Sequence, residues 1–429
     1  MYDRTDSQLL PAPERTVSLA AGLPPIPERL LLAHARGDVL FLCGAGVSKQ
    51  AGLPDFRQLV RGVYKSLDPP VYEILAESPG DPHHPPALDC SRLEDRQKAE
   101  VKRFVAREFD IVLGMLERRL DRETREDSTV RATVVHLLRE SGQKRSSTAS
   151  GPNEDAPTLD GTPTLQPPYP APIHSALIRL SNRGAATTIV TTNFDLALED
   201  AARKLRVPTQ TYALGSIPRP TRRNDFAGVF HIHGALTRNP SKYSDLILTD
   251  QDFGEFYLRR RVVPDLIYDA ARLFNLVLVG YRADDPPMRY LLNAVAADEA
   301  RFDDLKDRYV FVGTRDADTV TLEDWRARGI IPIAYDASDG HHSVLLRTLE
   351  RWAALSAING RQRVVDREIK RIVKTTRRDA PDADRTLFDH LFRRINPGER
   401  VHLAEIATAA GAEPAWLDAI MTVSAESDR

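Results

Sequence analysis

Two polar segments, each directly after a short apolar run, contain the residue types that could do chemistry in this chain. Segment 44–48 (Gly-Ala-Gly-Val-Ser) follows the apolar run 39–42. Glycines after a buried strand let backbone amides approach an anionic ligand closely, so this segment predicts a phosphate-binding loop. Segment 191–195 (Thr-Thr-Asn-Phe-Asp) follows a β-branched pair, where open α/β sheets place ligands.

A third apolar run, 229–232, ends in a polar turn that contains an imidazole, His233, followed by Gly234. A histidine near its ordinary pKa suits the role of a general base. An isolated histidine in a strand is more often a packed residue, and that is the interpretation for His231. His233 is the stronger catalytic candidate because it comes in chain order after segment 191–195.

Together the three segments resemble the sirtuin (Sir2) family. In that family Gly-Ala-Gly-x-Ser is followed by Ala-Gly-Leu-Pro-Asp-Phe-Arg, and residues 44–57 contain the whole string. The family pattern continues with Thr-x-Asn-x-Asp and then His-Gly, which match 191–195 and 233–234. A looser match is the run 276–281 with the aspartates 284–285, which resembles the turn that holds the adenosine end in prokaryotic Sir2-like proteins.

The resemblance implies roles for individual residues. His233, Asn193 and Asp195 would be catalytic. Ser48 and the backbone amides of Ala45 and Gly46 would meet the pyrophosphate, and residues 56–57 would close over the nicotinamide ribose. The residues implied to bind NAD+ are Gly44, Ala45, Gly46, Ser48, Asp55, Phe56, Arg57, Thr191, Gly280, Tyr281 and Asp285.

The chemistry follows from these residue types. Breaking the nicotinamide–ribose bond of NAD+ leaves an oxocarbenium-like cation, so the reaction needs a positioned nucleophile and a base for its proton. His233 is the candidate base. Asn193 can orient a water and a ribose hydroxyl through hydrogen bonds without adding a charge that would trap the cation.

Two departures from the family suggest a branch. Protein-deacylating sirtuins have a zinc ribbon of two Cys-x-x-Cys pairs, whereas this chain has only Cys43 and Cys90, so we expect no zinc. Instead, apolar residues at helical spacing predict a helical insertion at about 58–140. This combination resembles the Sir2-like NAD hydrolases of bacterial antiphage defence.

Three functions remain open from the sequence. The favoured one is an NAD+ hydrolase that releases nicotinamide and ADP-ribose. The alternatives are an NAD-dependent protein deacylase and a non-catalytic NAD-binding subunit of a larger complex. Because Sir2-like proteins of this kind commonly work in assemblies, the resemblance implies a homo-oligomer and allows a HerA-like hexameric ATPase as a partner.

Composition limits the remaining classes. With 429 residues, 42% hydrophobic and 28% charged, the chain can bury a large core. A net charge of −2 argues against a dedicated nucleic-acid binder, so nucleic acid would be met only indirectly or through a partner. Neither a membrane-spanning run nor a signal-peptide core is visible, so we expect a cytoplasmic protein without membrane contact.

The predicted fold is α/β, a Rossmann-like doubly wound parallel sheet with the helical insertion and a small α-helical C-terminal module. We expect a flexible arm at 1–27 and a Sir2-like NAD-binding domain at 28–355. Within that domain, the polar, proline-rich stretch at about 141–172 predicts a disordered loop.

The C-terminal module is expected at 356–429. It contains a basic helix around 365–378, interpreted as a solvated face on a packing helix rather than a phosphate contact. A helix-turn-helix pattern follows at 403–421, but its second helix offers Glu413, Trp416 and Asp418 rather than base-reading side chains. Protein contact is therefore the favoured interpretation of this pattern.

Overall fold

The computed structural model describes residues 14–78, 88–121, 127–146, 169–184, 186–218, 222, 226–236, 245–281, 286–298, 305–315 and 318–427. Within these ranges, no helix is both long and apolar enough to cross a membrane. The chain divides into two compact units, residues 39–350 and residues up to 38 together with those from 351 onward. Each unit is described by itself.

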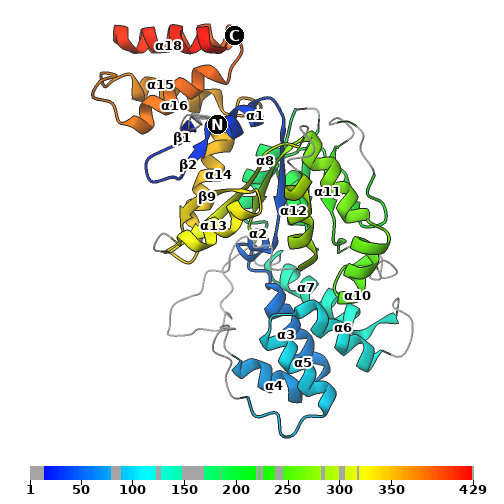
Figure 1. Cartoon of the computed structure of the whole chain (residues 1–429). Helices are drawn as coiled ribbons and strands as arrows, with labels where there is room; N and C mark the ends of the chain where they lie inside the picture. Colours follow the sequence, from blue (N-terminus) through cyan, green and yellow to red (C-terminus); the bar gives the residue numbers. More distant parts are fainter. Residues whose placement is uncertain are drawn as a thin grey trace, which may run out of the picture. The chain divides into compact units, whose positions relative to one another are not determined.

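A parallel seven-stranded sheet forms the centre of the 39–350 unit (Figure 1). Its strands are, in spatial order, β5 (Thr211–Ala213), β6 (Gly228–His231), β4 (Thr188–Thr191), β3 (Val39–Cys43), β7 (Asn275–Val279), β8 (Arg308–Thr314) and β9 (Ile331–Asp336). Every residue of β3, β4 and β6 is buried, as expected for parallel strands covered on both faces. The predicted α/β, Rossmann-like doubly wound sheet is confirmed.

Helices cover both faces of this sheet. Side chains of α11, α12 and α13 share one apolar core with alternate residues of β3 and β7. On β3 and β4, the contacts of the other face are made by α8. The helices of this layer system are α2 (Ala45–Lys49), α8 (Pro172–Ser181), α9 (Ala197–Lys204), α10 (Asp250–Phe253), the π-helix η5 (Gly254–Arg259), α11 (Val262–Leu273), α12 (Pro286–Asp298), α13 (Thr319–Ala327) and α14 (Ser343–Leu355).

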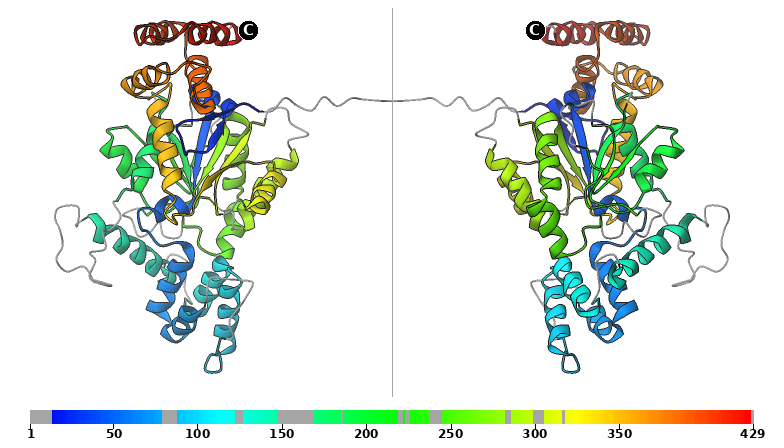
Figure 2. Two further views of the ribbon diagram at one scale, coloured as in Figure 1. Left: turned by 90° about the vertical axis from the view of Figure 1, so that its left-hand side faces the viewer. Right: turned by 90° about the vertical axis from the view of Figure 1, so that its right-hand side faces the viewer.

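A separate helical cluster, at the residues predicted to form an insertion, lies beside the carboxyl ends of the strands (Figure 2). Leu246 and Leu248, which come after β6, are buried in its apolar core. The cluster consists of α3 (Phe56–Leu67), α4 (Pro69–Glu77), α5 (Asp95–Val105), α6 (Phe109–Leu120) and α7 (Thr129–Ser146). Residues 141–146 of the predicted disordered loop therefore continue α7, and residues 147–168 lie outside the described ranges.

The order of the strands fixes where a ligand could bind. β3 comes first in this unit; β4, β5 and β6 lie on one side of it, and β7, β8 and β9 lie on the other. Ligands of open α/β sheets bind outside the carboxyl ends of the strands where the strand order reverses. Here that point lies between β3 and β7, next to segment 44–48.

The other unit combines a hairpin with helices. Its elements are β1 (Thr16–Ser18), β2 (Pro25–Pro27), α1 (Glu28–Ala35), the last turn of α14, α15 (Gln362–Ile372), α16 (Asp382–Arg393), α17 (Pro397–Ala409) and α18 (Pro414–Ser427). Residues 16–27 of the predicted flexible arm thus form an antiparallel hairpin, with Val17 and Ile26 buried. This unit also contains the C-terminal helices, and α16 contacts β1.

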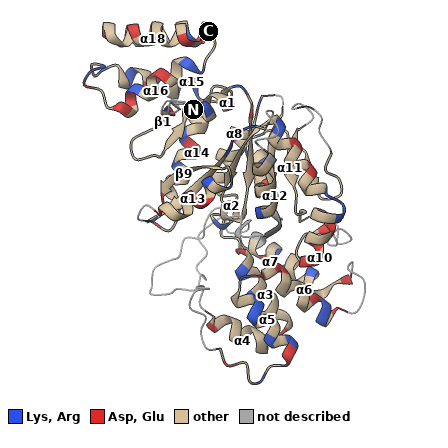
Figure 3. Ribbon diagram, in the orientation of Figure 1, with Lys and Arg blue, Asp and Glu red and all other residues tan. Residues whose placement is uncertain are grey.

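Both α15 and α16 have positive and negative residues (Figure 3). Arg371 lies 2.6 Å from both Glu368 and Asp384, and Arg377 lies 2.9 Å from Asp389. These ion pairs support the interpretation of this basic segment as a packing helix. In α18, Trp416 is fully buried and donates its Nε1–H to the Thr375 carbonyl oxygen at 2.9 Å, so it is a core residue rather than a contact offered to a partner.

Candidate functional site

The loops after β3 and β7 interlock through glycines. The Gly44 N–H donates to the Val279 carbonyl oxygen at 3.0 Å, and the Gly46 N–H donates to the Gly280 carbonyl oxygen at 2.8 Å. A Cβ on Gly44 would lie 2.6 Å from the Gly280 oxygen, which is too close for any side chain. Gly280 itself has a φ of +62°, a conformation that glycine adopts without strain.

This interlock changes the expected role of one amide. Segment 44–48 was predicted to offer its first amides to a pyrophosphate. The Gly46 amide already donates to Gly280, so it would reach a phosphate only if that hydrogen bond opened. Gly44, Gly46 and Gly280 therefore allow the two loops to pack closely at the switch point, in addition to any role in letting a ligand approach the backbone.

Asn193, Ser48 and Asp195 form a chain of hydrogen bonds at the ends of β3 and β4. The Asn193 Nδ2 group donates to the Gly44 carbonyl oxygen at 3.0 Å and to Ser48 Oγ at 2.7 Å. The Ser48 hydroxyl in turn donates to Asp195 Oδ2 at 2.6 Å. The structure therefore brings together three of the predicted residues, with Ser48 linking the other two.

Both Nδ2 hydrogens of Asn193 are used in these bonds. A carbonyl oxygen can only accept, so the atom that faces Gly44 is the amide nitrogen and Oδ1 points elsewhere. Within the described part of the chain, Oδ1 makes no hydrogen bond. The Asn193 side chain is thus fixed by its donor end and can accept a hydrogen bond from a water or a hydroxyl.

Two further predicted residues hold this loop in place. Thr191 Oγ1 accepts from the Asn193 N–H at 3.0 Å and donates to the Cys43 carbonyl oxygen at 3.2 Å. Asp195 Oδ1 accepts from the Ala197 N–H at 3.0 Å, in the first turn of α9. Asp195 therefore holds the start of a helix and the Ser48 hydroxyl at the same time, while Thr191 sets the backbone of Asn193.

His231, at the end of β6, lies behind the same loop. Its Nδ1–H donates to the Asn193 carbonyl oxygen at 2.8 Å, and its Nε2 lies 2.8 Å from Glu199 Oε1. Burial disfavours the charged imidazole, but the hydrogen bond and the charge of Glu199 outweigh it and raise the pKa of His231. Burial would raise the pKa of Glu199, yet its hydrogen bond to His231 lowers it. The pair is an ion pair that supports the Asn193 backbone.

His233, two residues further on, has very different neighbours. Its ring packs edge-on against Phe253 and Tyr257, with ring centroids 5.6 and 5.9 Å apart. Its Nε2 forms a hydrogen bond of 2.7 Å with the Tyr257 hydroxyl. Burial lowers the pKa of His233 to about 3, so the ring is neutral at neutral pH.

This pKa differs from the ordinary histidine pKa that the sequence suggested. In the described state, His233 can accept a proton but has little affinity for it, because burial penalises the charged ring. Contact with water or a substrate would raise its pKa. Catalytic hydrogen bonds often tighten only once a substrate is bound, so His233 remains the candidate base.

The aromatic neighbours of His233 belong to a segment anchored by a buried arginine. Arg131, on α7, donates to both Asp252 carboxylate oxygens at 2.7 and 2.8 Å and to the Leu246 carbonyl oxygen at 2.8 Å. Asp252 also accepts from the backbone N–H groups of residues 248 and 249. The segment then continues into the π-helix η5, which contains Tyr257; such helices are frequent at functional sites.

The predicted residues 55–57 lie on the helical cluster. Asp55 caps α3, where its side chain accepts from the Gln58 N–H at 2.9 Å. Phe56 packs against the apolar core of the cluster, and the Arg57 guanidinium donates to the Ser78 carbonyl oxygen at 2.7 Å. Asp55 also lies 4.0 Å from Lys49, the last residue of α2, and the Arg57 guanidinium lies over the Phe104 ring of α5.

The remaining predicted residues lie near the switch point. Tyr281 is buried in the sheet core beside Gly44, and Gly280 forms the interlock. Asp285 lies outside the described residues. Cys43 is buried, which raises its thiol pKa, and Cys90 is half-buried; both are free cysteines. Among the described residues, no group of His, Cys, Asp and Glu side chains is arranged to hold a metal ion.

Sequence reasoning missed several residues of this site. Glu199 and Tyr257 contact the two histidines, and His174, fully buried on α8, lies close enough to Asp195 for their charges to interact. Burial is the main effect on His174 and lowers its pKa. Of these residues, only Glu199 could have been predicted from the sequence. It lies in the first turn of the helix that follows Asp195, so its carboxylate must be close to the loop at the end of β4.

Comparisons with known proteins agree with this geometry. The sequence model of the SIR2-like domain family matches residues 187–333, which include the ends of β4 and β6. The chain is also 32% identical over 340 residues to a protein of Sinorhizobium fredii (strain NBRC 101917 / NGR234) described as "Uncharacterized protein y4cA". That match covers 77% of this chain and 24% of the relative, so the chain spans about a quarter of the relative's length.

The described fold agrees with the match to a SIR2-like domain. The parallel sheet and its switch point between β3 and β7 are consistent with such a domain. The loops that contain Asn193 and His233 lie within the matched range. From the family match and this fold together, we conclude that residues 187–333 belong to a SIR2-like domain.

Proposed function

We propose that the chain is an NAD+ hydrolase that releases nicotinamide and ADP-ribose. One observation carries the proposal. The Asn193 amide is fixed by Gly44 and Ser48 with its Oδ1 open, in the loop after β4, and His233 lies in the loop after the neighbouring strand β6. This arrangement provides a fixed acceptor and a neutral imidazole at neighbouring strand ends.

In the proposed reaction, the bond between nicotinamide and ribose breaks and its electron pair leaves with nicotinamide. The oxygen of a water forms the new bond to the ribose carbon, and the proton of that water goes to His233. Asn193 Oδ1 would orient the water or a ribose hydroxyl. Because the Asn193 side chain is neutral, it would not trap the cation as a covalent adduct.

The biological setting rests on family resemblance alone. We propose that NAD+ cleavage serves bacterial antiphage defence in the cytoplasm, by draining the cofactor. A homo-oligomer and a HerA-like hexameric ATPase are the proposed partners, and nucleic acid would act only indirectly or through such a partner.

A cavity favours one second candidate, an NAD-dependent protein deacylase. A cavity of about 170 Å³ lies next to Gly234, the residue that follows His233 in the chain. It is lined by Ala213, Leu214, Gly215, Ser216, Gly234, Ala235 and Asp245. Most of these side chains are small or apolar, so the cavity has room for an acyl chain beside the candidate base.

Incubation of the purified full chain with NAD+ tests the proposal, with nicotinamide and ADP-ribose followed by chromatography. We expect both products without any acyl peptide, and their loss in Asn193→Ala and in His233→Ala. His341→Ala, which removes an exposed histidine of the same unit, should keep activity.

The same assay separates the alternatives. Nicotinamide release only in the presence of an acyl-lysine peptide would identify a deacylase and refute the hydrolase. NAD+ binding by calorimetry without any release, both alone and with a co-purifying ATPase, would identify a non-catalytic binding subunit. Product release that is unchanged in Asn193→Ala would refute the proposed site.

A further inference from the structure

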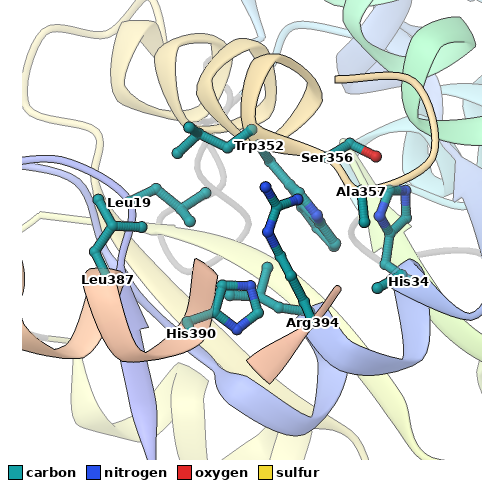
Figure 4. Close-up of a pocket in the computed structure, with 11 residues that line it drawn as sticks. Leu19, His34, Trp352, Ser356, Ala357, Leu387, His390 and Arg394 are labelled. Carbon is teal, nitrogen blue, oxygen red and sulfur yellow. The ribbon is translucent and has the colours of Figure 1, made fainter. Parts of the chain in front are cut away.

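A pocket in the unit that includes α1 and α16 contains an arginine, Arg394, with two hydrogen-bond donors that have no partner among the described residues. Its walls come from the N-terminal segment, from the end of α14 and from α16. The lining residues include Leu19, His34, Trp352, Ser356, Leu387, His390 and Arg394. Arg394 follows directly after α16, and Figure 4 shows its side chain pointing into the middle of the pocket.

Arg393 and Arg394 are neighbours in the chain but differ in their hydrogen-bond partners. Arg393 donates to Glu28 at 2.5 Å and to Glu426 at 3.1 Å. Glu28 is also 3.3 Å from His390, so its charge is already compensated. By contrast, the Nε and Nη1 atoms of Arg394 are buried and make no hydrogen bond within the described residues.

Buried guanidinium donors without a hydrogen-bond partner are costly, and folded proteins pair such groups or bind an ion beside them. The charge of Glu399 acts on Arg394, but the effect of burial outweighs it. Burial lowers the pKa of Arg394 to about 10, so the guanidinium is still charged at neutral pH. A water could fill its hydrogen bonds but would not compensate its charge. An anion in the pocket would both accept hydrogen bonds from Arg394 and offset its charge.

The size of the pocket limits the anion. The space open to the centre of a water-sized sphere is about 10 Å³, which corresponds to a single water-sized group. Phosphate, sulfate and gluconate are larger than this. The walls supplied by Leu19, Leu387 and Trp352 are apolar and suit a weakly hydrated ion.

We propose that this pocket binds one monovalent anion of the size of chloride, held by the Nε–H and Nη1–H groups of Arg394. The site stabilises the unit that contains α16 and is independent of the NAD+ reaction. It predicts that stability responds to the identity of the anion, and not only to ionic strength.

Thermal unfolding of the full chain in sodium chloride and in sodium gluconate, at equal ionic strength, tests this. We expect the midpoint in chloride to be higher by about 2–5 °C and to saturate with concentration. Arg394→Met should abolish this difference and should be at least as stable as the wild type in gluconate. Arg363→Met, which removes an exposed arginine of α15, should keep the chloride response.

A crystal grown in sodium bromide gives the direct measurement, because bromide is identified by its anomalous scattering. A bromide peak beside Arg394 is the expected result. A pocket containing only water, or a chloride response of equal size in the wild type and in both variants, would overturn the proposal. If Arg394→Met does not fold, the bromide structure of the wild-type protein decides the question.

Discussion

The two histidines at the end of β6 differ in almost everything but their residue type. His231 lies between Glu199 and the Asn193 carbonyl group, and its pKa is raised. His233 lies among aromatic rings, and its pKa is lowered to about 3. Neighbouring titratable groups whose surroundings push their pKa values apart are suited to different roles.

The difference separates a structural histidine from a chemical one. A charged His231 fixes a backbone carbonyl group and has no lone pair to offer, because both ring nitrogens donate. A neutral His233 keeps a lone pair that can accept a proton. The comparison therefore assigns support of Asn193 to His231 and proton transfer to His233, although the chain places them only one residue apart.

The largest expected effect separates these roles directly. In His233→Ala, NAD+ cleavage should fall by about 100- to 10,000-fold while NAD+ binding stays intact, because general-base help is lost. Single-turnover kinetics with calorimetric NAD+ binding measure both quantities. A fall in binding that accounts for the whole loss would show that His233 positions the substrate rather than taking its proton.

Next in size is the anchor of the aromatic wall around His233. Arg131→Met removes the cation that pairs with buried Asp252, so the free energy of unfolding should fall by about 3–5 kcal/mol in urea titrations. Arg118→Met is the matched control, because its ion pair with the neighbouring Asp250 is exposed and should contribute only about 0–1 kcal/mol. Equal effects of the two variants would contradict the anchoring role.

The ion pair behind Asn193 predicts a pH dependence. Glu199→Gln should lower the free energy of unfolding by about 1–3 kcal/mol, since buried His231 loses its charged partner. The raised pKa of His231 gives stability that is present below the ordinary histidine pKa of 6.5 and is lost as the pH rises through its folded pKa. The lowered pKa of Glu199 gives stability that is present above 4.5 and is lost as the pH falls through its folded pKa.

The difference between wild type and Glu199→Gln should therefore be largest between pH 4.5 and pH 6.5 and should shrink on both sides. Urea unfolding of both proteins across this range measures it. A difference that keeps growing as the pH rises above 7 would mean that His231 and Glu199 are not an ion pair in the folded state.

The smallest effect concerns the hydroxyl beside His233. Tyr257→Phe removes one hydrogen bond and keeps the ring packing, so the free energy of unfolding should change by about 0.5–1.5 kcal/mol. The ¹⁵N shifts of the His233 ring should change in this variant, and those of His231 should not. Identical His233 shifts in both proteins would argue against the Tyr257 hydrogen bond in solution.

Much of the fold and part of the site could be predicted from the sequence. The apolar runs before Gly44, Asn193 and His233 identified three strands, because buried parallel strands are apolar throughout. The polar loops that follow those runs contain the Asn193–Ser48–Asp195 chain. What remained hidden was the pairing of these residues with one another, since hydrogen bonds between distant segments leave no local pattern.

The missed features share one physical reason. Tyr257 and Arg131 reach the site from helices, where their spacing indicates only a packed or charged face. The low pKa of His233 results from burial by residues 253–257, which follow it only after a gap in sequence. Likewise, the hairpin at 16–27 is stabilised by helices at the other end of the chain. Its strands are short and one of them contains prolines, so the sequence alone predicted a flexible arm there.

The interlock of Gly44 and Gly46 with the loop after β7 has a consequence for biosynthesis. The β3 loop emerges from the ribosome early, but the carbonyl groups that fix it belong to residues 279 and 280. Contacts between distant segments form late, because a long loop must close first. The proposed nucleotide-binding loop therefore reaches its final shape only after β7 has been made, so a nascent chain that stops before β7 would lack a competent NAD+ site.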